Sequence, residues 1–443
     1  MNQLLKLNQI IQLNNNLTCT VKECLGGGGQ GEVYKADLNG TDVALKWYFF
    51  AQATTEQQQA LAELIQKKAP NDRFLWPISL AHSPDVKGFG YIMPLRPAHY
   101  KSIADLITRR AEPSFRHLIT ATMELADSFS QLHAKGLCYQ DISFGNVFID
   151  PDTGHILICD NDNVTTNKNA KTASVMGTPR FMAPEIVLGT AAPSSESDLF
   201  SLAVLLFYML MLHHPLEGKK EADIKCFDLP AMNKLYGREP IFIFDPNNDS
   251  NRPVAGYQDN AEIYWAIYPQ FIKELFTKAF TSGLHDPQHG RVRESEWRAA
   301  LVKLRDSLLY CSHCTAENFY DAQLLKDKGQ LNECWSCNEA LQVPPRILLQ
   351  HNNIAMIVML NHDTELFAHH TNPQRYYDFS NAVAKVNQHP QNPNIWGLKN
   401  LSADTWTVTQ DDGTMKTIAS GQSITLSAGI SINFGQAHGQ IRV

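Results

Sequence analysis

The sequence predicts a multidomain chain with an α+β two-lobed region, a small four-cysteine module and an all-β sandwich. Three observations lead to this fold class. A glycine-rich hairpin and its strands precede helical periodicity within residues 1–306, two close cysteine pairs lie within residues 307–342, and short alternating runs separated by turns fill residues 343–443. The first region divides into a β-rich lobe at about residues 1–93 and a helical lobe at about residues 94–306.

Composition limits the class of protein. The 443 residues are 44% hydrophobic and 19% charged, as in globular proteins, and a net charge of −7 provides no overall attraction to nucleic acid or to an anionic membrane. The longest apolar run, residues 202–212, is far shorter than the roughly 20 residues that span a bilayer. We therefore expect a buried helix there, and neither a membrane span nor a nucleic-acid partner.

The cysteines and the N-terminal residues indicate the compartment. Residues 1–16 have no charged head, apolar middle or small-residue cleavage site of an export signal. Nine cysteines in a chain of this length are too few for a disulfide scaffold. These features predict a cytoplasmic protein in a reducing environment.

The elements of the first region follow from local pattern. Residues 20–48 are expected to form a strand, a glycine loop and two further strands, with a tight hairpin turn at Asn39-Gly40. From Phe115 the apolar residues recur with a helical period.

The glycine loop, residues 26–31, contains G-x-G-x-x-G between two predicted strands. Glycines let a backbone approach phosphate oxygens closely and present its N–H groups to them. By itself, such a run is better explained by a flexible hairpin tip.

A lysine in the following strand strengthens the phosphate interpretation. Lys46 ends an apolar Val-Ala-Leu-Lys run, where it would meet α- and β-phosphates, and Glu63 on a predicted helix is placed to pair with it. Glu56 is the rival for that pairing, and an exposed edge lysine is the alternative for Lys46.

Two carboxylates and an amide follow in the helical lobe. Asp141 precedes Asn146 by five residues, and Asp160 follows an apolar strand. Taken singly, either aspartate could cap a helix or a turn. Residues 177–185 end in Ala-Pro-Glu, residues 198–203 open the buried helix, and Arg291 is a candidate to pair with Glu185.

Together these segments resemble the motifs of the protein kinases, in the family's order: the glycine-rich loop, the strand lysine, H-R-D-x-x-x-x-N, D-F-G and A-P-E. The resemblance implies a bilobal kinase fold and transfer of the γ-phosphoryl group of ATP to Ser or Thr hydroxyls of a partner protein, and of the chain itself. Asp141 would accept the hydroxyl proton, Lys46 braced by Glu63 would orient phosphates, and Asn146 with Asp160 would hold Mg²⁺ or Mn²⁺. The nucleotide would be enclosed by Gly26, Gly28, Gly31, Val33, Ala44, Met93 and Leu95.

The sequence departs from the family pattern at three places. Tyr139-Gln140 replaces the His-Arg before the catalytic aspartate, Ser143 replaces the usual Lys, and Asn161-Asp162 replaces the Phe-Gly of D-F-G. These changes leave open a pseudokinase or nucleotide-binding scaffold that acts through its C-terminal modules. Transfer of AMP is a third possibility, without support from the glycine loop.

The four-cysteine module has the spacing C-x2-C-x19-C-x2-C, formed by Cys311, Cys314, Cys334 and Cys337. Two tight turns would direct four thiolates at one structural Zn²⁺, with no open position for catalysis. Disulfides and a redox C-x-x-C are the alternatives, and His313 is a competing ligand.

Residues 396–435 resemble the latter half of a forkhead-associated (FHA) sandwich, without its usual phosphothreonine-binding residues. We expect an FHA-like interaction domain, and we expect His369-His370 to be polar surface.

The order of kinase, cysteine module and FHA-like domain resembles the bacterial kinases of tellurite-resistance-type (TerY-associated) phosphorylation systems. That resemblance implies stress signalling, a von Willebrand factor type A protein as substrate or scaffold, and an antagonistic metal-dependent phosphatase. The candidate autophosphorylation sites are Thr165, Thr166, Thr172, Ser174 and Thr178.

Overall fold

A computed structural model describes residues 3–14, 16–166, 178–351 and 354–443. The chain divides into two compact units. Unit 1 comprises Met1–Trp265 and Glu274–Arg298, and unit 2 comprises Ala266–Lys273 and Ala299–Val443. No helix among the described residues has the length and apolar character needed to cross a bilayer.

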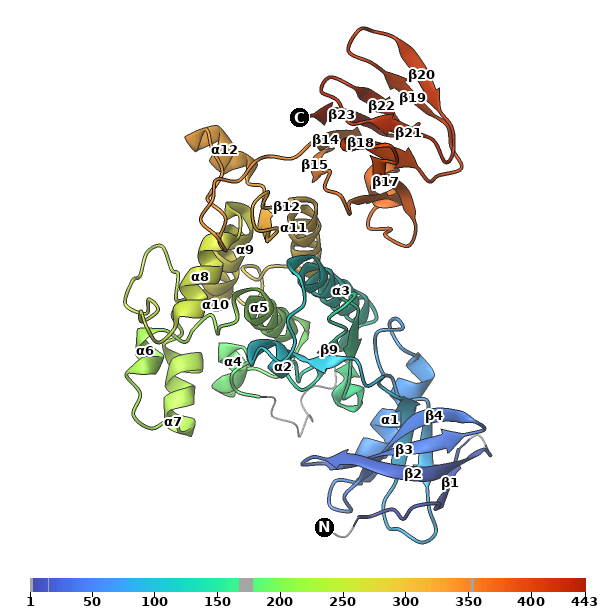
Figure 1. The fold of residues 1–443 in the computed structure, drawn as a ribbon. Helices are drawn as coiled ribbons and strands as arrows, with labels where there is room; N and C mark the ends of the chain where they lie inside the picture. Colours follow the sequence, from blue (N-terminus) through green and yellow to red (C-terminus); the bar gives the residue numbers. More distant parts are fainter. Residues whose placement is uncertain (1–2, 15, 167–177, 352–353) are drawn as a thin grey trace. The chain divides into compact units, whose positions relative to one another are not determined.

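Unit 1 begins with a six-stranded antiparallel barrel in the order β1-β2-β3-β4-β6-β5, drawn in blue in Figure 1. The strands are β1 (Ile10–Leu13), β2 (Thr18–Gly27), β3 (Gly31–Leu38), β4 (Thr41–Tyr48), β5 (Ser79–His82) and β6 (Gly90–Pro94). The predicted strand, glycine loop, strand and strand are therefore present. Asn39 and Gly40 both have positive φ and join β3 to β4, as the tight turn requires.

Helix α1 (Thr55–Lys67) lies between β4 and β5 in the chain. It begins after Thr54, whose side chain accepts a hydrogen bond from the N–H of Gln57. Leu61 and Leu64 are its buried residues, so one face of the helix turns toward the barrel cluster that contains Leu61.

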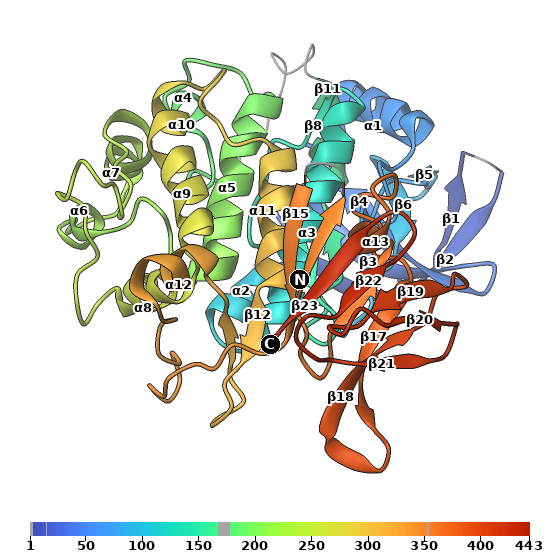
Figure 2. The ribbon, with the colours of Figure 1, turned by 90° about the horizontal axis from the view of Figure 1, so that it is seen from above.

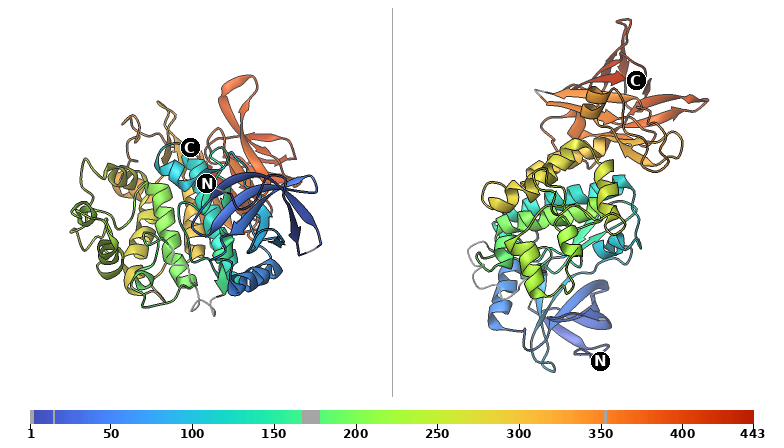
Figure 3. Two further views of the ribbon diagram at one scale, coloured as in Figure 1. Left: turned by 90° about the horizontal axis from the view of Figure 1, so that it is seen from below. Right: turned by 90° about the vertical axis from the view of Figure 1, so that its left-hand side faces the viewer.

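The remainder of unit 1 is mainly helical, and in the right-hand view of Figure 3 its green helices and the blue barrel occupy opposite ends of the unit. Its helices are α2 (Ile103–Ile107), α3 (Phe115–Ala134), α4 (Pro184–Val187), α5 (Ser195–Met211), α6 (Lys219–Ala222), α7 (Leu229–Met232), the π-helical turn Asn233–Arg238 and α10 (Ser282–His285). Three helices cross the boundary between the units: α8 (Asp259–Ile267), α9 (Gln270–Phe280) and α11 (Glu294–Asp306).

Helix α5 is the centre of this helical part. Every residue from Ser197 to Met211 is buried, which confirms the buried helix expected from the apolar run. It runs beside α3 in Figures 1 and 2, and its Phe207 packs edge-on against Phe276 and Phe280. A helix buried on all sides gives the loops that end against it a rigid support.

Short strands on either side of α2 and α3 in the chain position the loops that carry the predicted catalytic residues. They are β7 (Lys101–Ser102), β8 (Leu137–Cys138), β9 (Val147–Ile149), β10 (Ile156–Ile158) and β11 (Thr165–Thr166). Strand β9 pairs with β10 and β7, while β8 pairs with β11.

After the end of α11, unit 2 consists of the cysteine region and then a mostly sheet region. The former contains β12 (Leu308–Tyr310), β13 (Glu317–Phe319) and α12 (Ala322–Lys328). The latter contains β14 (Arg346–His351), β15 (Ile354–Met359), β16 (Glu365–Phe367), α13 (Ala368–Thr371), β17 (Ala382–His389), β18 (Asn392–Asn400), β19 (Trp406–Thr409), β20 (Met415–Ile418), β21 (Ser423–Thr425), β22 (Ser431–Asn433) and β23 (His438–Arg442).

These strands form two antiparallel sheets, in the orders β15-β14-β23-β22-β19-β20 and β16-β17-β18-β21. Buried residues from both sheets, including Leu349, Val386 and Trp406, form one apolar cluster. Alternate residues of each strand thus supply a common core, as in a sandwich.

Candidate active site

Lys46 lies in β4 and is 6% exposed. Its ammonium group has three acceptors: Asp162 Oδ2 at 2.8 Å, Gln30 Oε1 at 3.2 Å and Asp160 Oδ1 at 3.4 Å. The glycine loop that contains Gln30 therefore folds over the lysine, and the exposed-edge alternative does not apply. The structure brings together the lysine, the loop and Asp160.

The predicted pairing of Lys46 with Glu63 is not present. Glu63 is exposed on α1, and among the described residues the ion-pair partners of Lys46 are Asp160 and Asp162. Gln57 is the α1 residue that reaches the site, where its Nε2 donates to Tyr48 Oη at 3.2 Å and to the Asp162 carbonyl at 3.3 Å. Its spacing of four and seven residues from Leu61 and Leu64 is the helical signal that could have identified this face.

Asp162 was not predicted as a site residue. Its side chain is fully buried, and it accepts a short hydrogen bond from the Tyr48 hydroxyl as well as the ion pair from Lys46. Burial acts to raise the pKa of Asp162, but the attraction of Lys46 outweighs it and the pKa is lowered. Burial likewise opposes the charge on Lys46, but Asp162 and Asp160 leave its pKa raised. Both groups are therefore ionised at neutral pH.

The residues other than glycine that are predicted to enclose the nucleotide belong to one apolar cluster or pack against it. Ala44 pairs with Met93 across β4 and β6, and both are buried in it, while Val33 and Leu95 pack against it half-buried. The cluster lies next to Lys46, because Val33 pairs with Lys46 across β3 and β4.

The three loop glycines differ in their surroundings. A Cβ on Gly31 would lie 2.2 Å from the carbonyl oxygen of Trp47, so only glycine fits between β3 and β4 there. Gly26 has φ of 155° and, like Gly28, an exposed backbone with open space around it. The N–H of Gly28 donates to the carbonyl of Gly31 at 2.9 Å, which closes the tip of the loop.

Asp198 at the start of α5 supports the loop that carries Asp141. Its carboxylate accepts the backbone N–H groups of Tyr139 at 2.5 Å and Gln140 at 3.0 Å. Gln140 adopts a left-handed conformation with φ of 72°, and its side-chain amide donates to the hydroxyl of Thr165 in β11. Gln140, which stands where the family pattern has an Arg, therefore contacts β11.

Asn146 joins Asp141 to the segment that precedes Asp160. Asn146 Nδ2 donates to the carbonyl of Asp141 at 2.7 Å and to its Oδ2 at 3.3 Å, and the carbonyl of Asn146 accepts the N–H of Cys159 at 2.8 Å. Burial raises the pKa of Asp141, against the lowering effect of the Asn146 hydrogen bond. Its carboxylate is therefore a stronger proton acceptor than an exposed aspartate.

Asn161, which stands in place of the Phe of D-F-G, is buried and links two backbone segments by hydrogen bonds. Its Nδ2 donates to the carbonyls of Leu75 and Ile158, each at 2.9 Å. The loop after β10 is thereby fixed to the segment before β5 by hydrogen bonds.

Glu185 of the Ala-Pro-Glu segment receives two hydrogen bonds from Arg291 Nη2, at 2.7 and 2.8 Å, which confirms the expected pairing. Arg291 is 4% exposed. Of the candidate autophosphorylation sites, Thr172 and Ser174 lie outside the described residues. Thr165 and Thr166 form β11, and Thr178 is exposed.

In unit 2, the Sγ atoms of Cys311, Cys314, Cys334 and Cys337 lie within 4.8 Å of one another. Cys311 and Cys337 are 3.7 Å apart and Cys314 and Cys334 are 3.6 Å apart, against an edge of about 3.8 Å for four sulfurs around Zn²⁺. All nine cysteines are free thiols. The cluster is compatible with a closed zinc site, and Asn318 Nδ2, 3.4 Å from the Cys334 sulfur, would orient that ligand.

The expectation that His369 and His370 are polar surface is wrong, because both are buried next to Asp306. Nδ1 of His370 accepts the N–H of Phe367 at 2.8 Å, and Nδ1 of His369 accepts the N–H of Tyr377 at 3.0 Å. Nε2 of His370 lies 3.2 Å from Oδ1 of Asp306. These histidines are polar anchors of α13.

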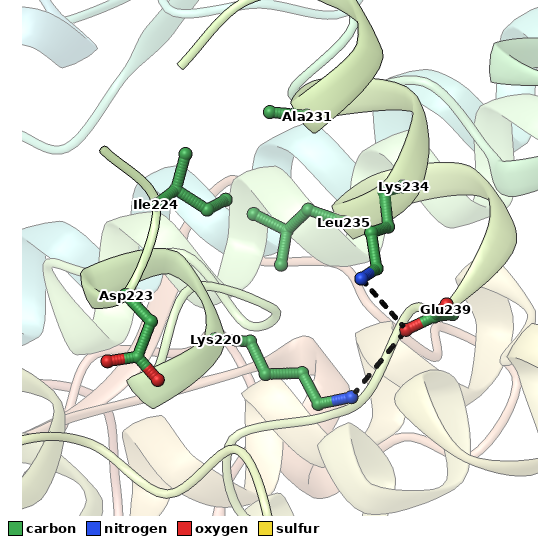
Figure 4. A pocket seen from close by; sticks show the side chains of 7 residues that line it. All are labelled: Lys220, Asp223, Ile224, Ala231, Lys234, Leu235 and Glu239. Atoms are coloured by element: carbon green, nitrogen blue, oxygen red, sulfur yellow. Dashed lines mark ion pairs between the residues drawn. The ribbon is translucent and has the colours of Figure 1, made fainter. Parts of the chain in front are cut away.

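A cavity of about 320 Å³ lies elsewhere in unit 1, among α6, α7 and the turn after α7 (Figure 4). Lys220 and Lys234 both point toward Glu239, at 4.0 and 3.9 Å. The cavity contains none of the residues predicted for phosphate transfer.

The protein kinase domain model matches residues 19–278, more than half of the chain. With the lysine, the glycine loop, the two aspartates and the Glu185–Arg291 pair assembled in unit 1, this match establishes the family. The chain belongs to the protein kinase domain family.

Curated relatives agree with this assignment. The chain is 26% identical to CBL-interacting protein kinase 4 of Oryza sativa subsp. japonica, over 41% of each protein. It is 35% identical to a putative ribosomal protein S6 kinase alpha-1 of Caenorhabditis elegans, over 35% of the chain and 19% of the relative. It is 29% identical to a probable serine/threonine-protein kinase CCRP1 of Zea mays, over 28% of the chain and 20% of the relative. The chain thus spans less than half the length of these relatives.

Proposed function

We propose that this protein is an ATP-dependent serine/threonine protein kinase that phosphorylates a partner protein and itself. The observation that supports the proposal is that, in unit 1, Lys46 contacts both the glycine loop and Asp160, and Asp141 contacts Asn146. A protein with only a nucleotide-binding role would not need Asp141, which the kinase reaction requires as a proton acceptor.

The proposed roles follow from position and charge. Asp141 would hold the substrate hydroxyl and take its proton as the hydroxyl attacks the γ-phosphorus. Its partly buried carboxylate, next to Asn146, suits that role. Lys46 would bind the α- and β-phosphate oxygens beneath Gly26, Gly28 and Gly31, and the adenine ring would lie against the cluster that contains Ala44 and Met93.

Asn146 and Asp160 provide oxygen donors of the kind that Mg²⁺ and Mn²⁺ prefer. The side chain of Asp160 is 45% exposed, so it can exchange its long contact with Lys46 for a cation. When bound there, the cation would neutralise developing charge on the transferred phosphoryl group. Glu63 has no part in this proposal, since it does not reach Lys46.

The C-terminal modules are proposed to recruit partners. Four sulfurs at tetrahedral spacing support a structural Zn²⁺ in residues 307–342, and two sheets with a shared core support an FHA-like interaction domain in residues 343–443. Residues 1–306 would then be the kinase domain. The bacterial TerY-type setting, its von Willebrand factor type A partner, its phosphatase and a cytoplasmic location stay proposals that rest on the sequence resemblance.

The second candidate is a pseudokinase scaffold. Two observations favour it. Asn161-Asp162 replaces the usual Phe-Gly, and Asp162 forms an ion pair with the ammonium group of Lys46. Such a protein would bind nucleotide without transferring its phosphate and would act through residues 307–443.

A phosphate-transfer assay separates these functions. The purified chain is incubated with Mg²⁺ and ATP labelled in the γ-phosphate, beside a generic protein acceptor, and labelled residues are identified after hydrolysis. We expect label on Ser or Thr and at least about a 100-fold loss in Asp141→Asn, the size of a missing general base. The matched control is Asp152→Asn, an exposed aspartate of the same lobe. Equal labelling in wild type and Asp141→Asn would refute the proposal.

A further inference from the structure

The partner of Lys46 comes from an unexpected part of the chain. A buried ammonium needs an ionised partner, because removing its charge from water is costly. Here the partner is Asp162, whose side chain is fully buried, at 2.8 Å. The contact with Asp160 is longer, 3.4 Å, and Asp160 is 45% exposed. The Asp162 pair is therefore the better shielded and the shorter of the two.

Other side chains hold the Asp162 carboxylate in place. The Tyr48 hydroxyl donates to the same Oδ2 that pairs with Lys46, and Gln57 donates to the carbonyl of Asp162. The preceding Asn161 is tied by two hydrogen bonds to backbone carbonyls. The carboxylate thus belongs to a loop that is fixed on both sides.

Helix α1 supplies no charge to this site. Its two carboxylates, on Glu56 and Glu63, are exposed, and its contribution is the neutral amide of Gln57. Among the described residues, the ionised groups that contact Lys46 are the two aspartates of the loop after β10. The position of Lys46 therefore depends on this loop rather than on the helix.

We propose that Asp162 is the positioning residue for Lys46, so that the phosphate-binding lysine is aligned by the same loop that carries the metal-binding Asp160. This inference rests on the proposed kinase function and adds a consequence for regulation. Alignment of Lys46 does not need a carboxylate brought in by movement of α1, because the loop already provides it.

The test compares Asp162→Asn with wild type and with Asp85→Asn, an exposed control in the same lobe. We expect kcat/KM for ATP to fall about 100-fold in Asp162→Asn, as for a misplaced catalytic group, and to be unchanged in Asp85→Asn. The double variant Asp162→Asn/Gln57→Glu places a carboxylate on α1 instead and should recover part of the activity.

A second readout does not depend on catalysis. Lys46 is labelled with an amine-reactive reagent, and its peptide is quantified by mass spectrometry with and without a non-hydrolysable ATP analogue and Mg²⁺. Loss of Asp162 should make Lys46 react faster, since the neutral amine is the reactive form, and should reduce the protection that the analogue provides. If wild type transfers no phosphate, the proposed function is refuted. The protection of Lys46 by the ATP analogue then decides by itself whether Asp162 positions the lysine.

Two results would overturn the inference: wild-type kcat/KM in Asp162→Asn, or unchanged labelling and protection of Lys46. Should Asp162→Asn not fold, Tyr48→Phe provides the test, because it removes the hydroxyl that fixes the carboxylate and retains both charges. We expect about a tenfold loss of kcat/KM from that change. Activity and labelling equal to wild type in Tyr48→Phe would contradict the proposed positioning.

Discussion

His133 predicts an unusual pH dependence of stability. It lies on α3 between two carboxylates: its Nε2 is 3.2 Å from Asp198, and its Nδ1 makes a short contact with Glu294. Burial by itself would lower the pKa of His133. The hydrogen bonds to Asp198 and Glu294 outweigh burial and raise it from 6.5 to about 9. The imidazole is therefore charged at neutral pH and links α3 to α5 and to the start of α11.

The sign and size of the effect follow from this pKa. Because the folded value lies above the unfolded value, the stabilisation is complete below about pH 6.5 and is lost as the pH rises through about 9. A shift of this size is worth about 3 kcal/mol. We expect the free energy of unfolding of His133→Asn not to fall in this way between about pH 6 and pH 9.5, although the variant is less stable than wild type throughout this range.

Urea unfolding of the full chain at both pH values, followed by far-ultraviolet circular dichroism, measures this difference. The matched control is His155→Asn, since His155 also pairs with a glutamate, at 2.8 Å, but its side chain is 62% exposed. We expect the control to keep the wild-type dependence on pH. If wild type and His133→Asn lose the same free energy of unfolding between the two pH values, the assignment of a charged His133 is refuted.

Two further predictions concern the Glu185–Arg291 ion pair and the four-cysteine cluster. Arg291→Ala should cost about 3 kcal/mol of unfolding free energy, because it leaves Glu185 without its partner. The exposed control Arg293→Ala should change stability by less than about 0.5 kcal/mol, and equal stabilities would contradict the role of the pair. Cys334→Ser should purify without zinc while the exposed Cys226→Ser retains it, as measured by elemental analysis. Equal zinc in both variants would remove the cluster as its site.

The sequence predicted best the features that depend on neighbouring residues. The Asn39-Gly40 turn requires only two positive φ values, and the buried helix α5 requires only a long apolar run. The family motifs also identified the pairing of Glu185 with Arg291, which are far apart in the chain.

The predictions are wrong where the position of a side chain depends on the rotation of a helix about its axis or on burial in the fold. Glu63 is expected to pair with Lys46 from its place on a predicted helix, but the cap at Thr54 and the buried leucines of α1 direct Gln57 toward the site instead. In the sequence, Asp162 stands where the family has a glycine, and only the fold brings its carboxylate to Lys46. The buried His369 is similar, since its anchoring by the N–H of Tyr377 has no local sequence signal.

We propose that Asp141 and its neighbours transfer the γ-phosphoryl group of ATP. Intact-mass spectrometry of wild type and Asp141→Asn, each incubated with ATP, Mg²⁺ and a protein acceptor, tests it most directly. We expect added phosphoryl masses in wild type and none in the variant. Unmodified wild-type protein and acceptor with ATP still bound, or the added mass of AMP in place of phosphoryl groups, would contradict it.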